Sequence, residues 1–528
     1  MTEEQIVAAI AAKGTEIRDI KNEKNPEKNK VTIARLVQEL LALKEQYKAQ
    51  TGKDFAPPKP TKTHSKNQVS KDTQPSKTPS KTEVSKDTQP SKNQAKKEKK
   101  QALKKKKKES SQLKQEDPIQ DEKESFPTQG QLFLRQAIFQ TESHDQGQIV
   151  TPWDVEAENG VNYDKLIEQF GCAKLDSTVV DRFERLTGHK AHRYLRRGFF
   201  FAHRDLNELL DAYEKGESFY LYTGRGPSSG SLHMGHLIPF TFNAWLQKVF
   251  QVPLVIQLTD DEKFLFRDQT LEESRRMMLE NVKDIITCGF DIKKTFIFGN
   301  TDYIQHLYPQ VLKVQKCVTY NQARGIFGFT GSDNIGKSAF PAVQAVPSFP
   351  ETFPIPFSGR KNLRCLIPCA IDQDPYFRMT RDVASRLEYL KPATIYSKFF
   401  PALQGSTTKM SASKASSTIY LSDSAEEIAN KIKRYAFSGG GETRADHEKY
   451  GANLKMDIPF QYLSFMLEDD KELEVIAEEY GSGRMMSGHV KEKLIQVMTD
   501  FILEMQERRQ CITQEEIEEF MRVRPLEF

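Results

Sequence analysis

The sequence predicts an α/β protein built on a parallel β-sheet, with a helical region before and after it in the chain. Three segments carry this prediction. Residues 219–222 form a short apolar run before a turn rich in glycine, serine and proline, and residues 252–258 (VPLVIQL) are almost continuously apolar. Such runs are typical of strands that are buried on both faces of a parallel sheet. A further apolar strand is expected from Cys365 onward, before Asp372 and Gln373.

The turn after the first strand is a candidate nucleotide site. Gly224 and Gly226 lack Cβ atoms, so a flat base and its ribose can approach the backbone there. His233 and His236 follow where the next helix should begin, and the backbone N–H groups and dipole of a helix start favour anions. Imidazole donors at this place could follow the charge that develops on a transferring phosphoryl group. Taken alone, the HMGH segment also fits a helix that opens with two solvent-facing histidines.

A second polar motif, KMSAS, occupies residues 409–413. It follows an apolar approach at 399–403 and a flexible stretch at 405–408. This composition suits a mobile loop that carries Lys409 onto a triphosphate, although polar loops of this kind are common by themselves. The order of the two motifs favours the nucleotide role over the ordinary loop.

HMGH and KMSAS resemble the two signature motifs of class I aminoacyl-tRNA synthetases, with Ala412 at the second lysine position of the KMSKS loop. Over nearly all of residues 150–528 the chain resembles the tryptophanyl-tRNA synthetases of the eukaryotic cytosolic type. The matching segments are TGRGPSS (223–229), HMGH (233–236), VIQLTDDEK (255–263), IFGFT (326–330), CAIDQDPYFRMTRD (369–382) and FFPALQ-x4-KMSAS (399–413). The resemblance implies a Rossmann-type catalytic domain at 125–413, with an N-terminal hairpin near 150–155, and an α-helical anticodon-binding domain at 414–528.

The resemblance also implies the site residues, position by position. In the tryptophan pocket, Tyr222 and Gln257 would face the indole N–H, and the ammonium group would be held by Glu262, Gln344 and Gln373. Such an acceptor has a physical reason, because the indole N–H can only donate and an unpaired buried donor costs ~1–3 kcal/mol. The implied ATP contacts are Gly224, Gly226, Gly235, Lys409, Met410, Ser411 and Ser413, and the implied catalytic residues are His233, His236, Lys409 and Arg225.

The implied reaction has two steps and uses ATP and Mg²⁺, with no metal site in the protein itself. The carboxylate of L-tryptophan attacks the α-phosphate of ATP and releases pyrophosphate, and the adenylate then esterifies the terminal ribose of tRNA(Trp). The resemblance further implies a homodimer. Two alternatives are a tyrosyl-type synthetase and a non-catalytic, synthetase-like protein that only binds RNA. The segment 371–382 favours the tryptophanyl branch, and the presence of His233, His236 and Lys409 favours catalysis.

Residues 1–57 are expected to form a helical hairpin, because isoleucines at 6, 10, 17 and 20 space one apolar face and residues 33, 36, 37 and 40 space another. They resemble the WHEP appendix of several synthetases, which implies an accessory tRNA or protein contact. A hairpin that only improves solubility is an equal alternative.

Residues 58–124 are expected to be a lysine-rich, disordered linker. Within it, residues 59–108 contain 17 lysines and four acidic residues. The linker could be a solvated spacer, a polybasic arm for RNA phosphates or a nuclear import signal.

One further motif, GSDNIGKS at 331–338, fits the P-loop pattern G-x4-G-K-[ST]. A P-loop needs a buried strand before it and an uninterrupted helix after it, whereas Pro341 and Pro347 follow closely here. A loop between elements of the catalytic domain is therefore the favoured interpretation. Further along, Ser424-x-x-Glu427 with apolar residues at 428, 432 and 435 predicts a helix, and a long helix is expected over 490–506.

Composition excludes several classes of protein. No run approaches eighteen apolar residues, the first fourteen residues are too polar for a signal peptide, and the six cysteines contain no C-x2-C pair. A reduced, cytoplasmic protein without a zinc site or membrane contact is expected.

Overall fold

The computed structural model describes residues 5–7, 9–10, 12–13, 35–36, 39–40, 42–43, 47, 49–51, 148–151, 155–157, 161–410 and 418–528. For residues 149, 155–157 and 406–409 only the backbone is described. The chain divides into two units, residues 1–121 and 122–528. The predicted linker over 58–124 and the residues 411–417 lie outside the described part.

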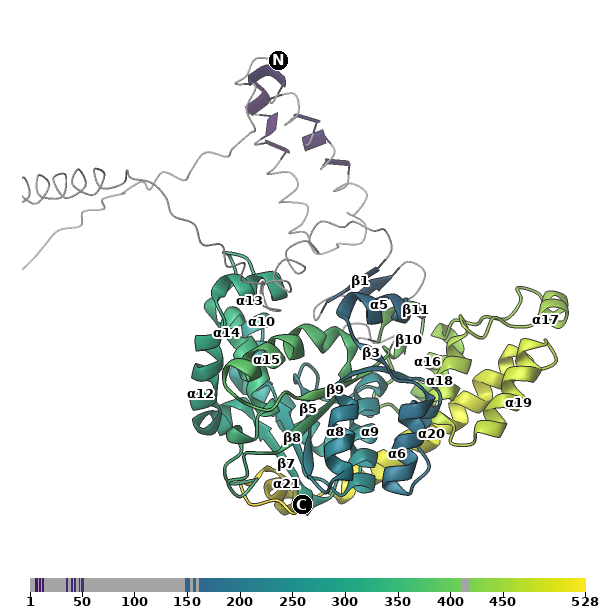
Figure 1. The fold of residues 1–528 in the computed structure, drawn as a ribbon. Helices are drawn as coiled ribbons and strands as arrows, with labels where there is room; N and C mark the ends of the chain where they lie inside the picture. The colour runs from purple at the N-terminus through teal and green to yellow at the C-terminus, as the bar shows by residue number, and fades with distance from the viewer. Residues whose placement is uncertain are drawn as a thin grey trace, which may run out of the picture. The chain divides into compact units, whose positions relative to one another are not determined.

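A seven-stranded sheet lies at the centre of the described part of the second unit (Figure 1), in the order β3-β4-β9-β8-β5-β6-β7. Strands β9, β8, β5, β6 and β7 run parallel, β4 pairs antiparallel with β9, and β3 pairs antiparallel with β4. The predicted α/β fold with a parallel sheet is thus confirmed. The strands are β3 (Ala173–Lys174), β4 (Phe200–Arg204), β5 (Phe219–Arg225), β6 (Leu254–Leu258), β7 (Thr295–Gly299), β8 (Arg364–Ala370) and β9 (Ala393–Ser397).

Two small antiparallel pairs accompany this sheet, β1 (Gln148–Val150) with β2 (Val155–Ala157), and β10 (Pro401–Ala402) with β11 (Gly405–Lys409). The hairpin of β1 and β2 occupies the place where an N-terminal hairpin is expected, and β2 lies against β11. The strand that leads into KMSAS therefore has this hairpin as a neighbour.

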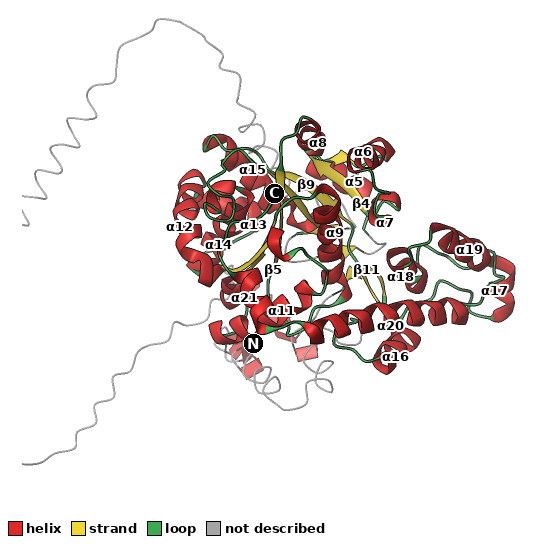
Figure 2. Cartoon of the chain, turned by 90° about the horizontal axis from the view of Figure 1, so that it is seen from below, coloured by secondary structure: helices red, strands yellow, loops and turns green. Residues whose placement is uncertain are grey.

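Helices cover both faces of the sheet. Those that follow the strands in chain order are α5 (Tyr163–Phe170), α6 (Ser177–Thr187), α7 (Arg193–Arg196), α8 (Leu206–Glu214), α9 (Met234–Phe250), α10 (Asp260–Phe266), α11 (Leu271–Ile286), α12 (Asn300–Cys317), α13 (Tyr320–Phe327), α14 (Ile335–Ala345) and α15 (Asp374–Arg386). Short 3-10 helices are η1 (Ile292–Lys294), η2 (Val346–Ser348), η3 (Pro350–Thr352) and η4 (Ile371–Gln373). Figure 2 shows α12, α14 and α15 on one side of the strands and α8 and α9 on the other.

The sheet separates two hydrophobic cores. Side chains alternate along a strand, so Leu221 of β5 belongs to the core beside α9, and its neighbour Tyr222 belongs to the core beside α12. We call these the α9 core (with Leu221, Leu237, Ile256 and Val282) and the α12 core (with Tyr222, Val255, Val311 and Phe377). The chain leaves β5 toward β6 and β7 and returns to β8 on the other side of β5. The ends of β5 and β8 therefore form the switch point where open α/β sheets bind ligands.

The C-terminal part of the unit is helical, as the pattern of apolar residues predicts. Its helices are α16 (Ala425–Tyr435), α17 (Arg444–Tyr450), α18 (Ile458–Met466), α19 (Asp470–Gly481), α20 (Ser487–Cys511) and α21 (Gln514–Met521). Helix α16 begins at the predicted capping box of Ser424 and Glu427. Ile428 and Ile432 are buried as expected, whereas Tyr435 is 41% exposed because it lies in the last turn.

The prediction of a loop at 331–338 is wrong in part, because α14 begins at Ile335 and continues through Pro341. A proline inside a helix removes one backbone hydrogen bond. Helix α14 nevertheless continues past Pro341, because the neighbouring residues Phe340 and Ala342 are buried and hold the backbone in place. The P-loop itself is excluded, because the element before the motif is helix α13 and not a strand.

In the first unit, the described residues of 5–13 and 35–51 are helical. Ile6, Ile10 and Leu36 are buried, and Lys13 pairs with Glu39 at 2.8 Å. The described parts of the two predicted helices are therefore joined by this ion pair, and the predicted apolar positions 17, 20, 33 and 37 lie outside the described residues.

Candidate active site

Tyr222 and Gln257 meet on the α12 face of the sheet, where both side chains are buried. The Tyr222 hydroxyl donates to Gln257 Oε1 at 2.6 Å and lies 3.1 Å from the backbone oxygen of Gln344. Gln257 Nε2 donates to Asn300 Oδ1 at 2.8 Å and lies 3.2 Å from Val343 O. Carbonyl and hydroxyl oxygens each accept two hydrogen bonds, so this pair keeps acceptor capacity for a donor from outside.

Gln344 and Gln373 belong to the same network, whereas Glu262 does not. Gln344 in the last turn of α14 donates from Nε2 to Oε1 of Gln373, at the end of η4, over 3.1 Å. Glu262, in α10 after β6, accepts from Thr259 Oγ1 at 2.7 Å and pairs with Lys263 Nζ at 2.7 Å. Burial lowers the pKa of Lys263, and the carboxylate of Glu262 opposes that shift.

Gly224 and Gly226 lie at the carboxyl end of β5 and just after it. Gly224 is exposed, so its backbone is open to a ligand. A Cβ atom at Gly226 would lie 2.5 Å from Glu262 Oε2 and 2.5 Å from Lys263 Cε. The missing side chain of Gly226 therefore also lets the turn close over α10, a packing role beyond the expected approach of a nucleotide.

Arg225 ends β5 as a half-buried cation. Its Nη2 donates to Ser228 Oγ at 3.4 Å, and its Nε has no partner in the described part of the chain. Burial lowers the pKa of Arg225 to about 10, against the attraction of Glu262, so the guanidinium stays charged at neutral pH. A partly desolvated cation with a spare donor is suited to an anionic ligand.

His233 and His236 begin α9, as predicted. His233 is the N-cap, and its backbone N–H donates to Nδ1 of His236 at 3.4 Å. The two rings stack with centroids 3.4 Å apart, and a Cβ at Gly235 would lie 3.2 Å from the His233 ring. Burial, with a smaller contribution from Arg225, lowers the pKa of His233 to about 3, so its imidazole is neutral at physiological pH.

The KMSAS residues are described only in part. Lys409, of which only the backbone is described, is the last residue of β11. The side chain of Met410 is buried, and the backbone N–H of Met410 donates to Phe400 O at 2.9 Å. Ser411 and Ser413 lie outside the described residues. The chain resumes beside the other motif, because Met234 N donates to Ile419 O at 3.0 Å.

The structure thus brings six of the expected residues together in two groups at neighbouring strand ends, and Glu262 belongs to neither group. One is the amide network of Tyr222, Gln257, Gln344 and Gln373, and the other is the start of α9. Sequence reasoning missed Asn300, which orients the Gln257 amide. The signal for it was available, since Asn300 follows the buried strand β7 and polar side chains after parallel strands meet at one edge of the sheet.

Two absences hold for the described residues. No three His, Cys, Asp or Glu side chains gather there as a metal site, and no helix is long and apolar enough to cross a membrane.

This sheet, with a histidine-capped helix at its switch point, is the arrangement of a class I synthetase. The family described as tRNA synthetases class I (W and Y) matches residues 214–348 and 356–502, more than half of the chain, and the WHEP-TRS domain matches residues 6–61. The chain is 59% identical over 388 residues to a cytoplasmic tryptophan–tRNA ligase of Arabidopsis thaliana, covering 73% of this chain and 96% of that relative. It is 56% identical over 394 residues to that of Dictyostelium discoideum, covering 74% and 98%.

Solved structures agree with these relatives. The tryptophanyl-tRNA synthetase of Plasmodium falciparum superposes with a TM-score of 0.65 and 49% identity over 69% of this chain and 95% of that one. The tryptophan-bound enzyme of Encephalitozoon cuniculi gives a TM-score of 0.62 and 41% identity over 69% and 100%. The chain therefore belongs to the tryptophan–tRNA ligases, of the cytoplasmic type, within the class I synthetase family.

Proposed function

We propose that this chain carries out the tryptophan–tRNA ligase reaction at the carboxyl ends of β5, β6 and β8. The enzyme consumes ATP and tryptophan and charges tRNA, as its family does. The observation that carries the site assignment is the buried acceptor pair of Tyr222 and Gln257 at the switch point of the sheet.

The pair suits an indole ring for a chemical reason. The indole N–H is a donor only, and Gln257 Oε1 and the Tyr222 hydroxyl oxygen retain lone pairs. The orientation of Gln257 is set by its Nε2, which donates to Asn300 and so turns Oε1 toward Tyr222. Tyr222 packs edge-on to Phe377, with ring centroids 6.2 Å apart, and supplies an apolar wall.

The ammonium group of tryptophan is assigned to Gln344, Gln373 and Glu262. The side-chain oxygens of Gln344 and Gln373 accept hydrogen bonds, and the two residues are already linked. Glu262 pairs with Lys263 in this structure, so its role requires the carboxylate to share its charge with the ligand. This makes Glu262 the least direct of the three assignments.

Activation of the carboxylate is assigned to the start of α9, to Arg225 and to Lys409. Attack on the α-phosphate needs alignment and charge stabilisation, without a covalent enzyme intermediate. His233 and His236 offer ring N–H donors at the positive end of the α9 dipole, and Arg225 and Lys409 supply positive charge. Gly224, Gly226, Gly235, Met410, Ser411 and Ser413 are the further ATP contacts that we propose.

Mg²⁺ is proposed to enter together with ATP. The acidic side chains after β6 already have partners, since Asp260 accepts from Thr301 and Asp261 accepts from Asn300. Phosphate oxygens and water are the usual ligands of Mg²⁺ in ATP-dependent enzymes, so the ion needs no dedicated carboxylate cage.

ATP–pyrophosphate exchange with each of the twenty amino acids tests the assignment. Exchange with tryptophan alone is expected, because the other side chains leave the acceptor pair unpaired or do not fill a pocket shaped for two fused rings. Exchange with tyrosine would overturn the pocket assignment, and absence of exchange with any amino acid would favour the RNA-binding alternative.

We also propose that residues 414–528 bind the anticodon arm of the tRNA. In this region Tyr450 is 70% exposed, and Lys449 Nζ lies 4.7 Å from the centre of its ring. Exposed aromatic rings beside cations stack unpaired bases, and Tyr435 and Phe437 are further exposed rings in the same region.

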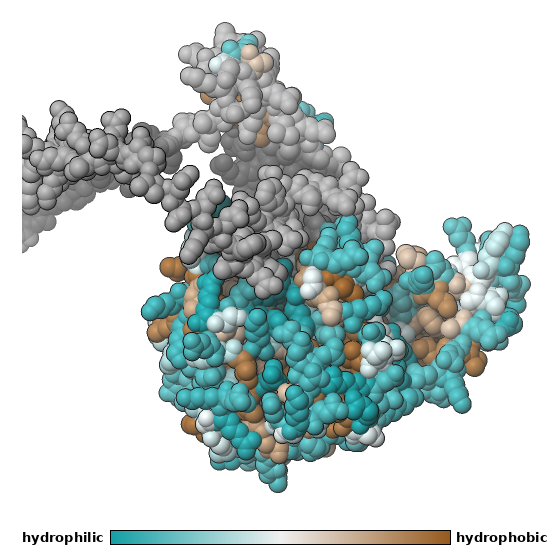
Figure 3. All heavy atoms as spheres, in the orientation of Figure 1, coloured by the Kyte–Doolittle hydropathy of each residue, from teal (hydrophilic) through white to brown (hydrophobic). Residues whose placement is uncertain are grey.

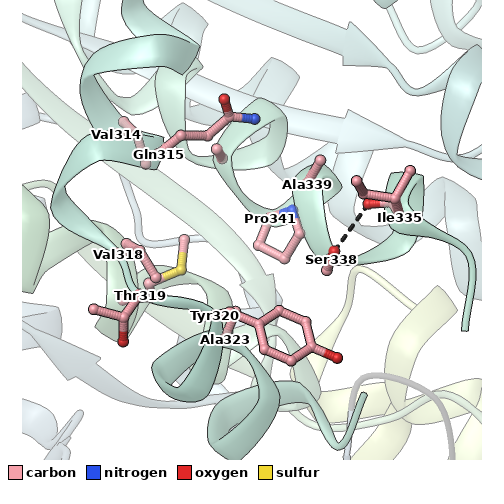
Figure 4. A pocket seen from close by; sticks show the side chains of 12 residues that line it. Val314, Gln315, Val318, Thr319, Tyr320, Ala323, Ile335, Ser338, Ala339 and Pro341 are labelled. Atoms are coloured by element: carbon pink, nitrogen blue, oxygen red, sulfur yellow. Dashed lines mark hydrogen bonds between the residues drawn. The ribbon is translucent and has the colours of Figure 1, made fainter. Parts of the chain in front are cut away.

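We propose that the chain forms a homodimer through an apolar surface formed by α12, α13 and α14. Ile304, Tyr308 and Leu312 are exposed at i, i+4 spacing along α12, and Tyr320 and Ile335 are 53% and 87% exposed. Apolar side chains reach the surface over α12 at the left edge of Figure 3. A cavity of about 210 Å³ between α12, α13 and α14 adds a hollow that a second copy could fill (Figure 4).

Changing Tyr308 and Leu312 together to glutamate is expected to yield a monomer near 60.5 kDa, whereas the unchanged chain has about twice that mass. Charges in an apolar interface lack partners when the two surfaces close. Light scattering after size-exclusion chromatography measures the mass. As a control, Val475→Glu, at an exposed apolar position on α19, should keep the mass of the unchanged chain. A monomeric unchanged chain would contradict the proposal.

A further inference from the structure

Helix α20 connects the C-terminal helices with the catalytic part of the unit. It is 25 residues long, and Val490, Leu494, Met498 and Ile502 form its buried stripe. It contacts α16, α18 and α19, and it also contacts α11. In Figure 2 it runs as one long rod from the region of α17 toward α11. A continuous helix transmits displacement along its axis, because each backbone hydrogen bond fixes the next turn.

The last turns of α20 are linked, through Asp284 of α11, to the residue that precedes the first signature motif. Arg509 Nε donates to Asp284 Oδ1 at 2.6 Å, and its Nη2 donates to Glu280 Oε2 at 2.5 Å. The other oxygen of Asp284 accepts the backbone N–H of Leu232 at 2.8 Å. Leu232 is followed directly by His233. One carboxylate, with its side chain 1% exposed, therefore joins the end of α20 to the start of α9.

The same end of α20 reaches the chain that follows the second signature motif. Gln506 Nε2 lies 2.7 Å from the backbone oxygen of Leu421 and 3.0 Å from that of Asp423. Leu421 N in turn donates to Leu232 O at 2.8 Å. The segment after KMSAS and the segment before HMGH are thus bonded to each other. The first is bonded to α20 directly through Gln506, and the second is linked to α20 through Asp284 of α11.

Asp284 lies in α11, and this helix also supports the preceding turn. Asn281, one turn earlier on α11, donates to Ser229 O at 2.8 Å, and both Asn281 and Asp284 are buried. The nucleotide turn therefore rests on polar side chains of α11. Arg509 is the contact that neutralises the buried carboxylate of this support.

We propose that Arg509 and Gln506 are positioning residues for amino acid activation. By holding Asp284 and the Leu421 and Asp423 carbonyls, the end of α20 sets the place of both signature motifs relative to each other. The inference rests on the proposed function, since it assumes that these motifs act on ATP. It adds that the C-terminal helices contribute to the activation step through α20, and not only to the binding of tRNA.

The test compares Arg509→Ala with Arg509→Lys in ATP–pyrophosphate exchange. Arg509→Ala is expected to lower kcat of exchange roughly ten- to hundredfold, because small displacements of reacting groups have effects of this size. The KM for tryptophan should remain within twofold, since the Tyr222 and Gln257 pair lies in the other core of the sheet. Arg509→Lys keeps a cation beside Asp284 and should recover part of the turnover.

Arg508→Ala is the matched control. Arg508 is the neighbouring arginine, and it bonds to Glu504 and to the Thr287 carbonyl without touching Asp284. Its kcat should stay near that of the unchanged chain. Thermal unfolding of each variant separates positioning from a loss of folded protein.

Several outcomes would overturn the inference. One is a folded Arg509→Ala variant with unchanged kcat, and another is a loss of activity that only follows the fraction of folded protein. If Arg509→Ala does not fold, Gln506→Ala gives the same test, with the same expected fall in kcat and the same contrary result. Absence of exchange in the unchanged chain would instead count against the proposed function.

Discussion

Replacement of His236 by alanine is expected to lower kcat of tryptophan-dependent ATP–pyrophosphate exchange by about a hundredfold or more. His236 occupies the third position of α9, beside the ring of His233 and at the positive end of the helix dipole. A donor held there in advance stabilises charge on the transferring phosphoryl group without reorganisation during the reaction. The dissociation constant of tryptophan should remain unchanged, because the pocket proposed for it lies on the other face of the sheet.

The variant His236→Glu separates catalysis from helix capping. His236 Nδ1 accepts the backbone N–H of His233, and loss of such a cap costs about 1 kcal/mol of stability. Glutamate at this position accepts the same N–H, so the melting temperature should return toward that of the unchanged chain. Turnover should stay low, since a carboxylate cannot donate to a phosphate. Exchange within threefold of normal in His236→Ala would mean that the histidine only caps α9.

The second large effect is expected from Gln257→Leu, which should lower kcat/KM for tryptophan by about ten- to a hundredfold. Leucine removes the proposed acceptor for the indole N–H and takes one hydrogen-bond partner from Tyr222 and one from Asn300. An unpaired buried donor or acceptor costs ~1–3 kcal/mol, and each 1.4 kcal/mol is a factor of ten. Steady-state exchange kinetics over a range of tryptophan concentrations measure the effect.

A tryptophan analogue with sulfur in place of the indole N–H tests specifically the hydrogen bond from that N–H to Gln257. The unchanged chain should prefer tryptophan over the benzothiophene analogue, and Gln257→Leu should lose that preference. Gln247→Leu is a matched control, because Gln247 is also a buried glutamine but bonds to Thr295 in the α9 core. It should keep the preference even if it unfolds at a lower temperature. A preference that survives Gln257→Leu would contradict the role of Gln257.

Local patterns in the sequence were sufficient for the elements around the site. The apolar run at 252–258 predicted β6, which spans Leu254–Leu258, and the capping box at Ser424 predicted the start of α16. These signals are local, because strand burial and helix capping depend on residues a few positions apart. The prediction that Pro341 interrupts a helix was wrong because local patterns do not include tertiary packing. Packing around α14 outweighs the one missing hydrogen bond.

The site itself needed more than local patterns. The roles of Tyr222 and Gln257 came from the resemblance to a family, and their mutual hydrogen bond depends on the register of β5 and β6, in which Gly224 pairs with Gln257. Asn300 and Asp284 act through partners 43 and 52 residues away in the chain. Contacts at such separations are set by the packing of the whole sheet and its helices. No local pattern marks them.

The division of the sheet into two cores has a consequence for how such an enzyme can change. The side chains that we propose to select the amino acid are packed in the α12 core, and the helix that we propose to act on the nucleotide is packed in the α9 core. Substitutions that reshape one core leave the side chains of the other in their original environment. An engineer could therefore alter the choice of amino acid by repacking around Tyr222 and Phe377, while the chemistry of adenylation is inherited intact.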